Sequence, residues 1–92
     1  MIIAEISVVP LGTNNPSISS YVKRAILEIK KLGLKSNLTA MGTIVESKNI
    51  DDIFLAIKKI HEALFDQKVL RLVTTIKIDE RRDKEGSVDQ KI

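Results

Sequence analysis

The side chains best suited to chemistry are two carboxylates, Glu5 and Glu46, which lie in largely apolar stretches of the sequence. A carboxylate on a covered strand needs a partner, because burying an unpaired charge is costly. Three hydrogen-bonding side chains, Ser7, Asn37 and Thr39, fall at positions that would share a sheet face with the carboxylates. Together these five residues could form a pocket for a cationic or amidine-like ligand.

Two other interpretations of the carboxylates stay open. Each carboxylate could pair with Lys77 or with a lysine of a partner subunit, which would make it a structural group. Two carboxylates could also do acid–base catalysis, but the sequence offers no nucleophile or metal-binding set to accompany them. There is no cysteine, and the one histidine, His61, falls on the apolar stripe of a predicted helix. We therefore expect no enzyme activity, no metal site and no cofactor.

Hydrophobic periodicity predicts the first two elements that would position these residues. Residues Ile2–Pro10 are rich in β-branched side chains and predict a strand. A turn-rich loop follows over residues 11–16, and Ser17 is the predicted N-cap of an amphipathic helix. Apolar residues recur at helical spacing as far as Leu32, and Gly33 is expected to end the helix.

The next two strands are predicted to form a hairpin. Residues 34–41 and residues 43–48 alternate between apolar and polar side chains, which is typical of half-buried strands. A two-residue turn at Met41-Gly42 would place Asn37 opposite Glu46. This register brings both side chains to the same face as the carboxylate of the first strand.

A second helix and a fourth strand complete the predicted domain. Asn49 is the predicted N-cap of the helix, and residues 70–78 predict the strand. The helix carries an apolar stripe that we expect to be buried: Ile50, Ile53, Phe54, Ile57, Ile60, His61, Leu64 and Phe65. Tyr21 on the first helix is likewise expected in the core. We assign residues 1–80 to one domain and the charged residues 81–92 to a C-terminal tail.

The element order βαββαβ predicts an α+β fold, the ferredoxin-like two-layer sandwich. In that arrangement a four-stranded antiparallel sheet has the first and third strands at its centre and both helices on one face. The other face stays open and carries residues of mixed character: Glu5, Ser7, Val9, Asn37, Thr39, Ile44, Glu46, Val73, Thr75 and Lys77. Such a face is too apolar for simple solvent surface and too polar for a core, which predicts a ligand platform or an interface between copies.

Composition narrows the functional classes further. A chain of 92 residues suffices for one compact domain, and a net charge of +3 is too small to indicate nucleic-acid binding. The first and third predicted strands hold no aromatic residue on which bases could stack, so an RNA-recognition domain is not expected. No apolar run is long enough to span a membrane, and the amino terminus lacks the features of a signal peptide. We expect a cytoplasmic protein with no nucleic-acid or membrane partner.

Four segments resemble the thiamine-binding protein family of small ferredoxin-like domains, and together they span nearly the whole chain: Ile6–Thr13, Ser17–Val22, Met41–Glu46 and Thr75–Arg82. The resemblance implies a homo-oligomer, often a tetramer, that is built by packing open sheet faces together. It also implies binding of thiamine or of its hydroxymethylpyrimidine part, without catalysis. Residues at positions that match the family's motifs are Gly12, Thr13, Ser20, Thr43 and Glu46.

The resemblance and the residues lead to one hypothesis: a non-catalytic tetramer, built as a dimer of dimers, that binds thiamine or its pyrimidine moiety. Thiamine carries a cationic thiazolium and an aminopyrimidine with adjacent donor and acceptor nitrogens, which a carboxylate with polar neighbours could satisfy. The predicted ligand-binding residues are Glu5, Ser7, Asn37, Thr39, Thr43 and Glu46. A structural or regulatory oligomer similar to ACT domains, with another ligand or none, is the alternative.

Overall fold

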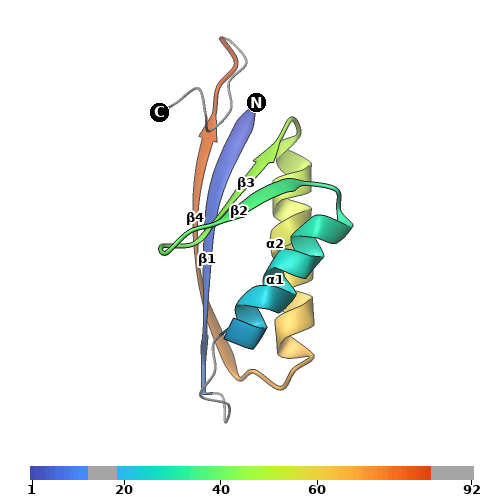
Figure 1. Ribbon diagram of the computed structural model, residues 1–92, viewed down its shortest axis with the longest axis vertical. Coiled ribbons are helices and arrows are strands. Elements are labelled where there is room, and N and C mark those ends of the chain that lie inside the picture. Colours follow the sequence, from blue (N-terminus) through green and yellow to red (C-terminus); the bar gives the residue numbers. More distant parts are fainter. Residues whose placement is uncertain (13–18, 84–92) are drawn as a thin grey trace.

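The computed structural model describes residues 1–12 and 19–83. Its elements are β1 (Ile2–Leu11), α1 (Ser19–Lys31), β2 (Lys35–Leu38), β3 (Thr43–Ser47), α2 (Ile50–Phe65) and β4 (Arg71–Glu80). The strands form one antiparallel sheet in the order β2-β3-β1-β4, and both helices lie on one face of it (Figure 1). The predicted α+β, ferredoxin-like arrangement is confirmed, with β1 and β3 at the centre of the sheet. The predicted N-cap Ser17 and residues 84–92 of the predicted tail lie outside the described residues.

The core lies between the helix-facing side of β1 and the two helices. Ile2, Ala4 and Ile6 are at most 3% exposed, and they alternate with partly exposed residues on the opposite side of the strand. This period of two is what a strand covered on one face requires. From the helices, the most deeply buried residues are Ile29, Ile53, Ala56, Ile60 and Leu64. Within the described part of the chain, no helix is long and apolar enough to cross a membrane.

The register of β2 and β3 differs from the predicted two-residue hairpin. Asn37 pairs with Ile44 rather than with Glu46, so residues 39–42 form a four-residue loop. Lys35 takes the place opposite Glu46. Because the register moved by two residues, each strand side chain keeps its predicted face of the sheet while its cross-strand neighbour changes.

Thr39 explains the longer loop. Its hydroxyl accepts hydrogen bonds from the backbone N–H groups of Met41 and Gly42, each at 3.2 Å, and donates to the Gly42 carbonyl oxygen at 2.9 Å. The backbone N–H of Thr39 donates to the same carbonyl oxygen at 2.8 Å. A threonine hydroxyl can close a turn in this way because it competes with the strand ladder for nearby backbone groups.

Helix α2 begins where predicted, after the N-cap Asn49. The side-chain oxygen of Asn49 accepts a hydrogen bond from the N–H of Asp51 at 2.9 Å. The hydroxyl of Ser47 accepts from the Asn49 N–H and donates to the Asp52 carboxylate, each at 3.1 Å. The N-cap thus satisfies one of the N–H groups that the first turn of a helix leaves without intrahelical partners.

The prediction that Phe54 and Phe65 are buried is wrong, because their exposed fractions are 55% and 45%. The buried stripe of α2 instead includes Ala56 and Ala63. Small alanine side chains let a helix approach its neighbours closely, and a helix packed on that side turns its neighbouring large residues outward. Tyr21 of α1 is 7% exposed and is buried as predicted.

The N-cap of α2 can be tested by mutation. We expect Asn49→Ala to lower the free energy of unfolding by about 1 kcal/mol, because the N–H of Asp51 loses its acceptor. Asn49→Asp keeps an acceptor and is the control, with an expected change of at most about 0.3 kcal/mol. Urea unfolding followed by circular dichroism at one protein concentration measures both. Equal losses in the two variants would contradict the capping role.

Candidate functional site

β1 is paired unequally on its two sides. It pairs with β4 over all ten of its residues, but with β3 only from Ile2 to Ile6. The chain beside β3 then forms the loop of residues 39–42, and a Cβ atom on Gly42 would lie 3.0 Å from the Ile6 carbonyl oxygen. The unequal pairing leaves a notch beside residues 7–11 of β1, on the side where the ladder with β3 has ended.

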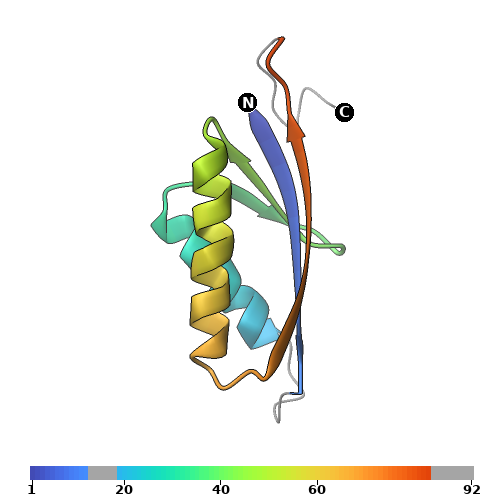
Figure 2. The ribbon, with the colours of Figure 1, turned by 180° about the vertical axis from the view of Figure 1, so that it is seen from behind.

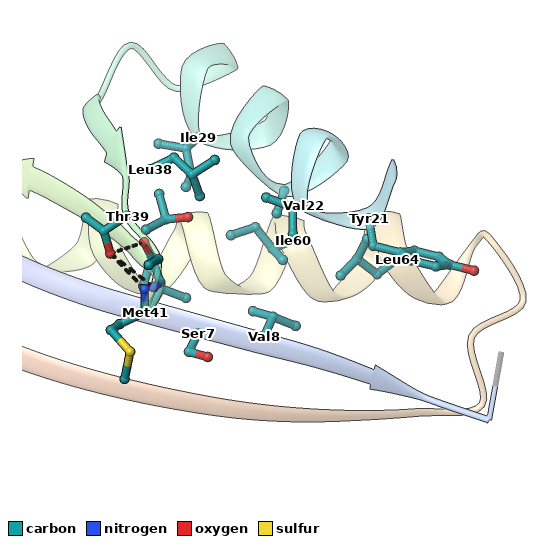
Figure 3. A pocket seen from close by; sticks show the side chains of 15 residues that line it. Ser7, Val8, Tyr21, Val22, Ile29, Leu38, Thr39, Met41, Ile60 and Leu64 are labelled. Atoms are coloured by element: carbon teal, nitrogen blue, oxygen red, sulfur yellow. Dashed lines mark hydrogen bonds between the residues drawn. The ribbon is translucent and has the colours of Figure 1, made fainter. Parts of the chain in front are cut away.

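A cavity of about 180 Å³ lies at this notch (Figure 3). Its walls come from α1, α2, β1, β3 and the loop between β2 and β3. Figure 3 shows Val22 and Ile60 over its middle, with Tyr21 and Leu64 toward one end and Thr39 at the other. The aliphatic hydroxyls in the wall belong to Ser7, Thr39 and Thr43. The cavity is therefore mainly apolar, with a few polar groups that could orient a ligand.

Four residues that carry a hydroxyl line the cavity, namely Ser7, Thr39, Thr43 and Tyr21. Thr43 is 8% exposed, so a hydrogen bond between its hydroxyl and a ligand would be shielded from water. The hydroxyl of Thr39 bonds the loop backbone and holds that wall in place. Leu38 and Met41, which are 60% and 78% exposed, form the rim. The described residues that line the cavity include no carboxylate, imidazole or amine, which are the usual groups for acid–base catalysis.

Three of the predicted ligand-binding residues line this cavity, namely Ser7, Thr39 and Thr43. Thr43 pairs with Ile6 in the ladder and therefore faces the helices with it. Thr39 lies in the loop rather than on a strand of the open face. The predicted residues that do not line the cavity are Glu5, Asn37 and Glu46.

Glu5, Asn37 and Glu46 share the open face of three neighbouring strands. Glu5 is opposite Lys77 on β4 and opposite Ile44 on β3. Asn37 lies opposite Ile44 in turn, on β2. Glu46 is two residues along β3 from Ile44, so it lies diagonally from Glu5, at about 7–8 Å between Cα atoms. The carboxylates are neighbours on one face, as predicted, but neither lines the cavity. Glu5 is adjacent to it, because its Cγ atom would lie 3.4 Å from a Cβ atom on Gly42, which does line the cavity.

Glu46 already has a structural partner. It is 7% exposed, and its Oε2 atom lies 3.2 Å from Nζ of Lys35. The interpretation in which a carboxylate pairs with a lysine therefore applies to Glu46, although the lysine is Lys35 rather than Lys77. The pair follows from the four-residue loop, because the observed register places Lys35 directly opposite Glu46.

The contribution of α1 to the cavity was not predicted. Tyr21, Val22 and Ala25 all line it. The signal available in the sequence is Ala25, a small residue among larger ones on the apolar stripe of the helix. A small residue on a packed face leaves space unless a neighbour fills it. Here β3 does not fill it, because the ladder of β3 with β1 extends only as far as Thr43 opposite Ile6.

His61 lies outside the cavity, on the other side of α2. Its Nε2 atom is 2.6 Å from the hydroxyl oxygen of Thr74, so the imidazole is tied to β4. In residues 1–12 and 19–83, no group of three or more His, Asp and Glu side chains is placed to hold a metal ion. We therefore take the cavity beside α1 as the candidate site in the described part of the chain.

Known proteins resemble this chain over nearly its whole length. The model of the thiamine-binding protein family matches residues 4–92. A UPF0045 protein of Methanothermobacter thermautotrophicus is 41% identical over 100% of this chain and 93% of its own length. A UPF0045 protein of Bacillus subtilis is also 41% identical, over 100% of this chain and 91% of its own length.

Solved structures share the fold. The crystal structure of a hypothetical protein from Methanocaldococcus jannaschii has a TM-score of 0.87 at 43% identity, covering 98% of this chain and 90% of that chain. A domain of unknown function from Bacillus cereus has a TM-score of 0.86 at 26% identity, covering 99% and 86%. A Thermotoga maritima protein described as a candidate for thiamine biosynthesis or salvage has a TM-score of 0.80 at 23% identity, covering 99% and 94%.

The element order βαββαβ and the four-stranded sheet define a small ferredoxin-like domain. Its cavity has room for a small ligand between the helices and the end of β3. The chain belongs to the thiamine-binding protein family, because the family model and relatives at 41% identity both match it almost from end to end. The resemblance of four separate segments to that family is therefore confirmed.

Thr39 can be tested as the residue that shapes one wall of the cavity. Thr39→Val removes the hydroxyl but keeps the shape, so we expect the free energy of unfolding to fall by about 1 kcal/mol. Thr39→Ser retains the hydroxyl and is the matched control, with an expected loss of less than about half as much. Chemical denaturation measures both values. Identical stabilities for valine and serine at this position would show that the hydroxyl does not hold the loop.

Proposed function

We propose that the protein is a non-catalytic cytoplasmic homo-oligomer that binds thiamine or its hydroxymethylpyrimidine moiety, with the pyrimidine ring in the cavity beside α1. The observation that carries this proposal is the volume of the cavity, about 180 Å³. A cavity of about 150 Å³ holds a benzene ring, whereas pockets for drug-sized ligands begin at about 300 Å³. The cavity therefore suits one substituted ring.

The polar groups of the notch suit the edge of an aminopyrimidine. Beyond Ile6 the ladder of β1 with β3 has ended, so alternate residues of 7–11 direct backbone polar groups toward the notch, although Pro10 has no N–H to donate. An aminopyrimidine presents a donor and an acceptor side by side, which matches the edge of a strand. The hydroxyls of Ser7 and Thr43 would add further hydrogen bonds.

The cationic thiazolium of thiamine would lie beyond the rim formed by Leu38 and Met41. Both rim residues are mostly exposed, so the positive charge would stay in water and avoid a desolvation cost. This position differs from the open-face pocket expected around Glu5 and Glu46. Since Glu46 is paired with Lys35, we assign the carboxylate a structural role in this proposal.

Self-association through the open face is part of the proposed function. Val9 and Val73 lie opposite each other on that face, and each is 43% exposed. A monomer would leave this apolar pair in water, whereas two open faces packed together would bury it. We propose a tetramer, built as a dimer of dimers. A structural or regulatory oligomer with another ligand or none is the alternative, and ligand titration separates the two.

Titration calorimetry tests the ligand. Protein stripped of ligand should bind hydroxymethylpyrimidine within about tenfold of its affinity for thiamine, because only the ring would occupy the cavity. A site that recognised the thiazolium charge would bind thiamine more than about a hundredfold tighter than the pyrimidine alone. No heat from either ligand up to millimolar concentration would contradict the proposal. That result would favour the alternative, a structural or regulatory oligomer with another ligand or none.

Filling the cavity tests the location. Ala25→Leu extends a side chain from α1 into the cavity, and we expect affinity to fall at least about tenfold with no loss of stability, since alanine and leucine have similar helix propensities. Ala25→Ser is the size-matched control and should bind as wild type does. Glu46→Gln should also retain affinity. A loss of about ten- to a hundredfold in Glu46→Gln, with Ala25→Leu unaffected, would place the ligand on the open face instead.

A further inference from the structure

The start of β1 shows which way each of its backbone groups points. The Arg81 N–H donates to the Met1 carbonyl oxygen at 3.3 Å, and the Met1 amino group donates to the Arg81 carbonyl oxygen at 3.5 Å. This pair continues the register in which Ile2 is opposite Glu80 of β4. In an antiparallel ladder, such mutually bonded pairs recur at every second residue. The odd-numbered residues of β1 therefore bond β4, and the even-numbered residues direct their backbone groups to the other side.

Two further observations agree with this alternation. The carbonyl oxygen of Ile6 is on the β3 side, because a Cβ atom on Gly42 would lie 3.0 Å from it. Pro10 is opposite Leu72 in the ladder with β4, although proline has no N–H to donate. Because Pro10 is even-numbered, its ring nitrogen is on the side away from β4 and removes no ladder bond. A proline fits within this strand since its nitrogen faces the notch.

Val8 is the even-numbered residue between Ile6 and Pro10, and it lies beyond the end of the ladder with β3. Its N–H and C=O groups therefore face the notch side by side, with no β3 residue opposite them. A continued ladder would place Met41 there, but the Met41 N–H donates to the Thr39 hydroxyl at 3.2 Å instead. Within residues 7–11, Val8 is the residue that offers the notch both a backbone donor and a backbone acceptor.

The cavity lies against this unpaired stretch of β1. Figure 2 shows β1 and β4 side by side, with the loop between β2 and β3 leaving the sheet part way along them. Val8 lines the cavity, and Val22 and Ile60 form the wall on the helix side (Figure 3). A flat ring between these walls could present one edge to the Val8 backbone.

We propose that the backbone of Val8 selects the ligand. Its N–H donates to a ring nitrogen, and its carbonyl oxygen accepts from an amino group on the neighbouring ring carbon. The class of ligand is then set by this pattern: a six-membered heteroaromatic ring with an acceptor nitrogen beside an amino substituent. The inference rests on the proposed function and deepens it, because the aminopyrimidine of thiamine has this pattern and Val8 becomes the residue that reads it.

The surroundings of Val8 suit this role. Ser7 and Val9 on either side are held in the ladder with β4, so the Val8 groups are fixed in place and little is ordered on binding. The Val8 side chain packs against the hydrophobic core, and hydrogen bonds formed beside it are shielded from water. A ring that bonds only one of the two groups leaves the other without a partner, which weakens binding.

A ligand analogue tests the pattern. Titration calorimetry compares hydroxymethylpyrimidine with an analogue in which a methyl group replaces the amino group, since the two have nearly the same shape. The analogue cannot donate to the Val8 carbonyl oxygen, so we expect it to bind about ten- to a hundredfold more weakly. Equal affinities for the two compounds would overturn the inference while leaving the proposed function in place.

Amide hydrogen exchange, followed by nuclear magnetic resonance, tests the residue. In protein stripped of ligand, the protection factor of the Val8 N–H should be at least about tenfold lower than those of Ser7 and Val9, which bond β4. Saturation with hydroxymethylpyrimidine should raise the protection of Val8 by a larger factor than that of either neighbour. A Val8 amide that is already as protected as its neighbours, or that does not respond to bound ligand, would overturn the inference.

Val8→Pro removes the same N–H by mutation and spares the ladder with β4, as Pro10 does in the natural strand. We expect native circular dichroism and an affinity for hydroxymethylpyrimidine that is at least about tenfold lower. Val9→Pro is the matched control: it removes an N–H that bonds β4 and should lower stability more than Val8→Pro does. Wild-type affinity in folded Val8→Pro would contradict the role of Val8.

The outcomes separate this inference from the proposed function. Wild-type protein that binds neither thiamine nor hydroxymethylpyrimidine would overturn both. Wild-type protein that binds the pyrimidine, yet accepts the methyl analogue equally well, would overturn only the assignment to Val8. If Val8→Pro does not fold, the analogue titration and the exchange measurement decide, because both use the wild-type chain.

Discussion

The unequal pairing of β1 is the constraint on which the other features of this domain depend. β1 pairs with β4 along its whole length but loses β3 after Ile6. On one side this leaves a notch, where Ser7 and Val8 line a cavity together with residues of α1 and of a loop instead of pairing with a strand. On the other side it requires a β4 as long as β1, and that strand is the edge of the sheet. A cavity and a long edge strand thus arise from one mismatch in strand length.

The fold could be predicted from the sequence because its two periods are clear, as Ile2, Ala4 and Ile6 show for β1. The features that escaped prediction depend on single contacts. The loop of residues 39–42 is set by one threonine hydroxyl, which no alternation of apolar and polar residues reveals. The outward position of Phe54 depends on which side of α2 packs against its neighbours, and hydrophobicity alone does not decide between adjacent positions on a stripe.

The candidate site was predictable only in part, for the same reason. Ser7, Thr39 and Thr43 line the cavity, yet the sequence pointed to the open face, where Glu5 and Glu46 are neighbours. β3 begins at Thr43, as the predicted strand over residues 43–48 does, but the loop of residues 39–42 that forms one wall of the cavity was not predicted. The same two-residue difference in register exchanges Asn37 for Lys35 opposite Glu46, and so turns a candidate ligand group into half of an ion pair.

Ser7 links the cavity to the outer strand of the sheet. It lines the cavity, and its partner in the ladder is Thr75 of β4. Because the ladder of β1 with β3 ends at Ile6, the ladder with β4 alone holds this part of β1 in the sheet. A β4 that ended level with Ile6 would leave Ser7 and Val8 without a hydrogen-bonded neighbouring strand on either side. The length of β4 thus supports a wall of the cavity, although β4 itself does not line it.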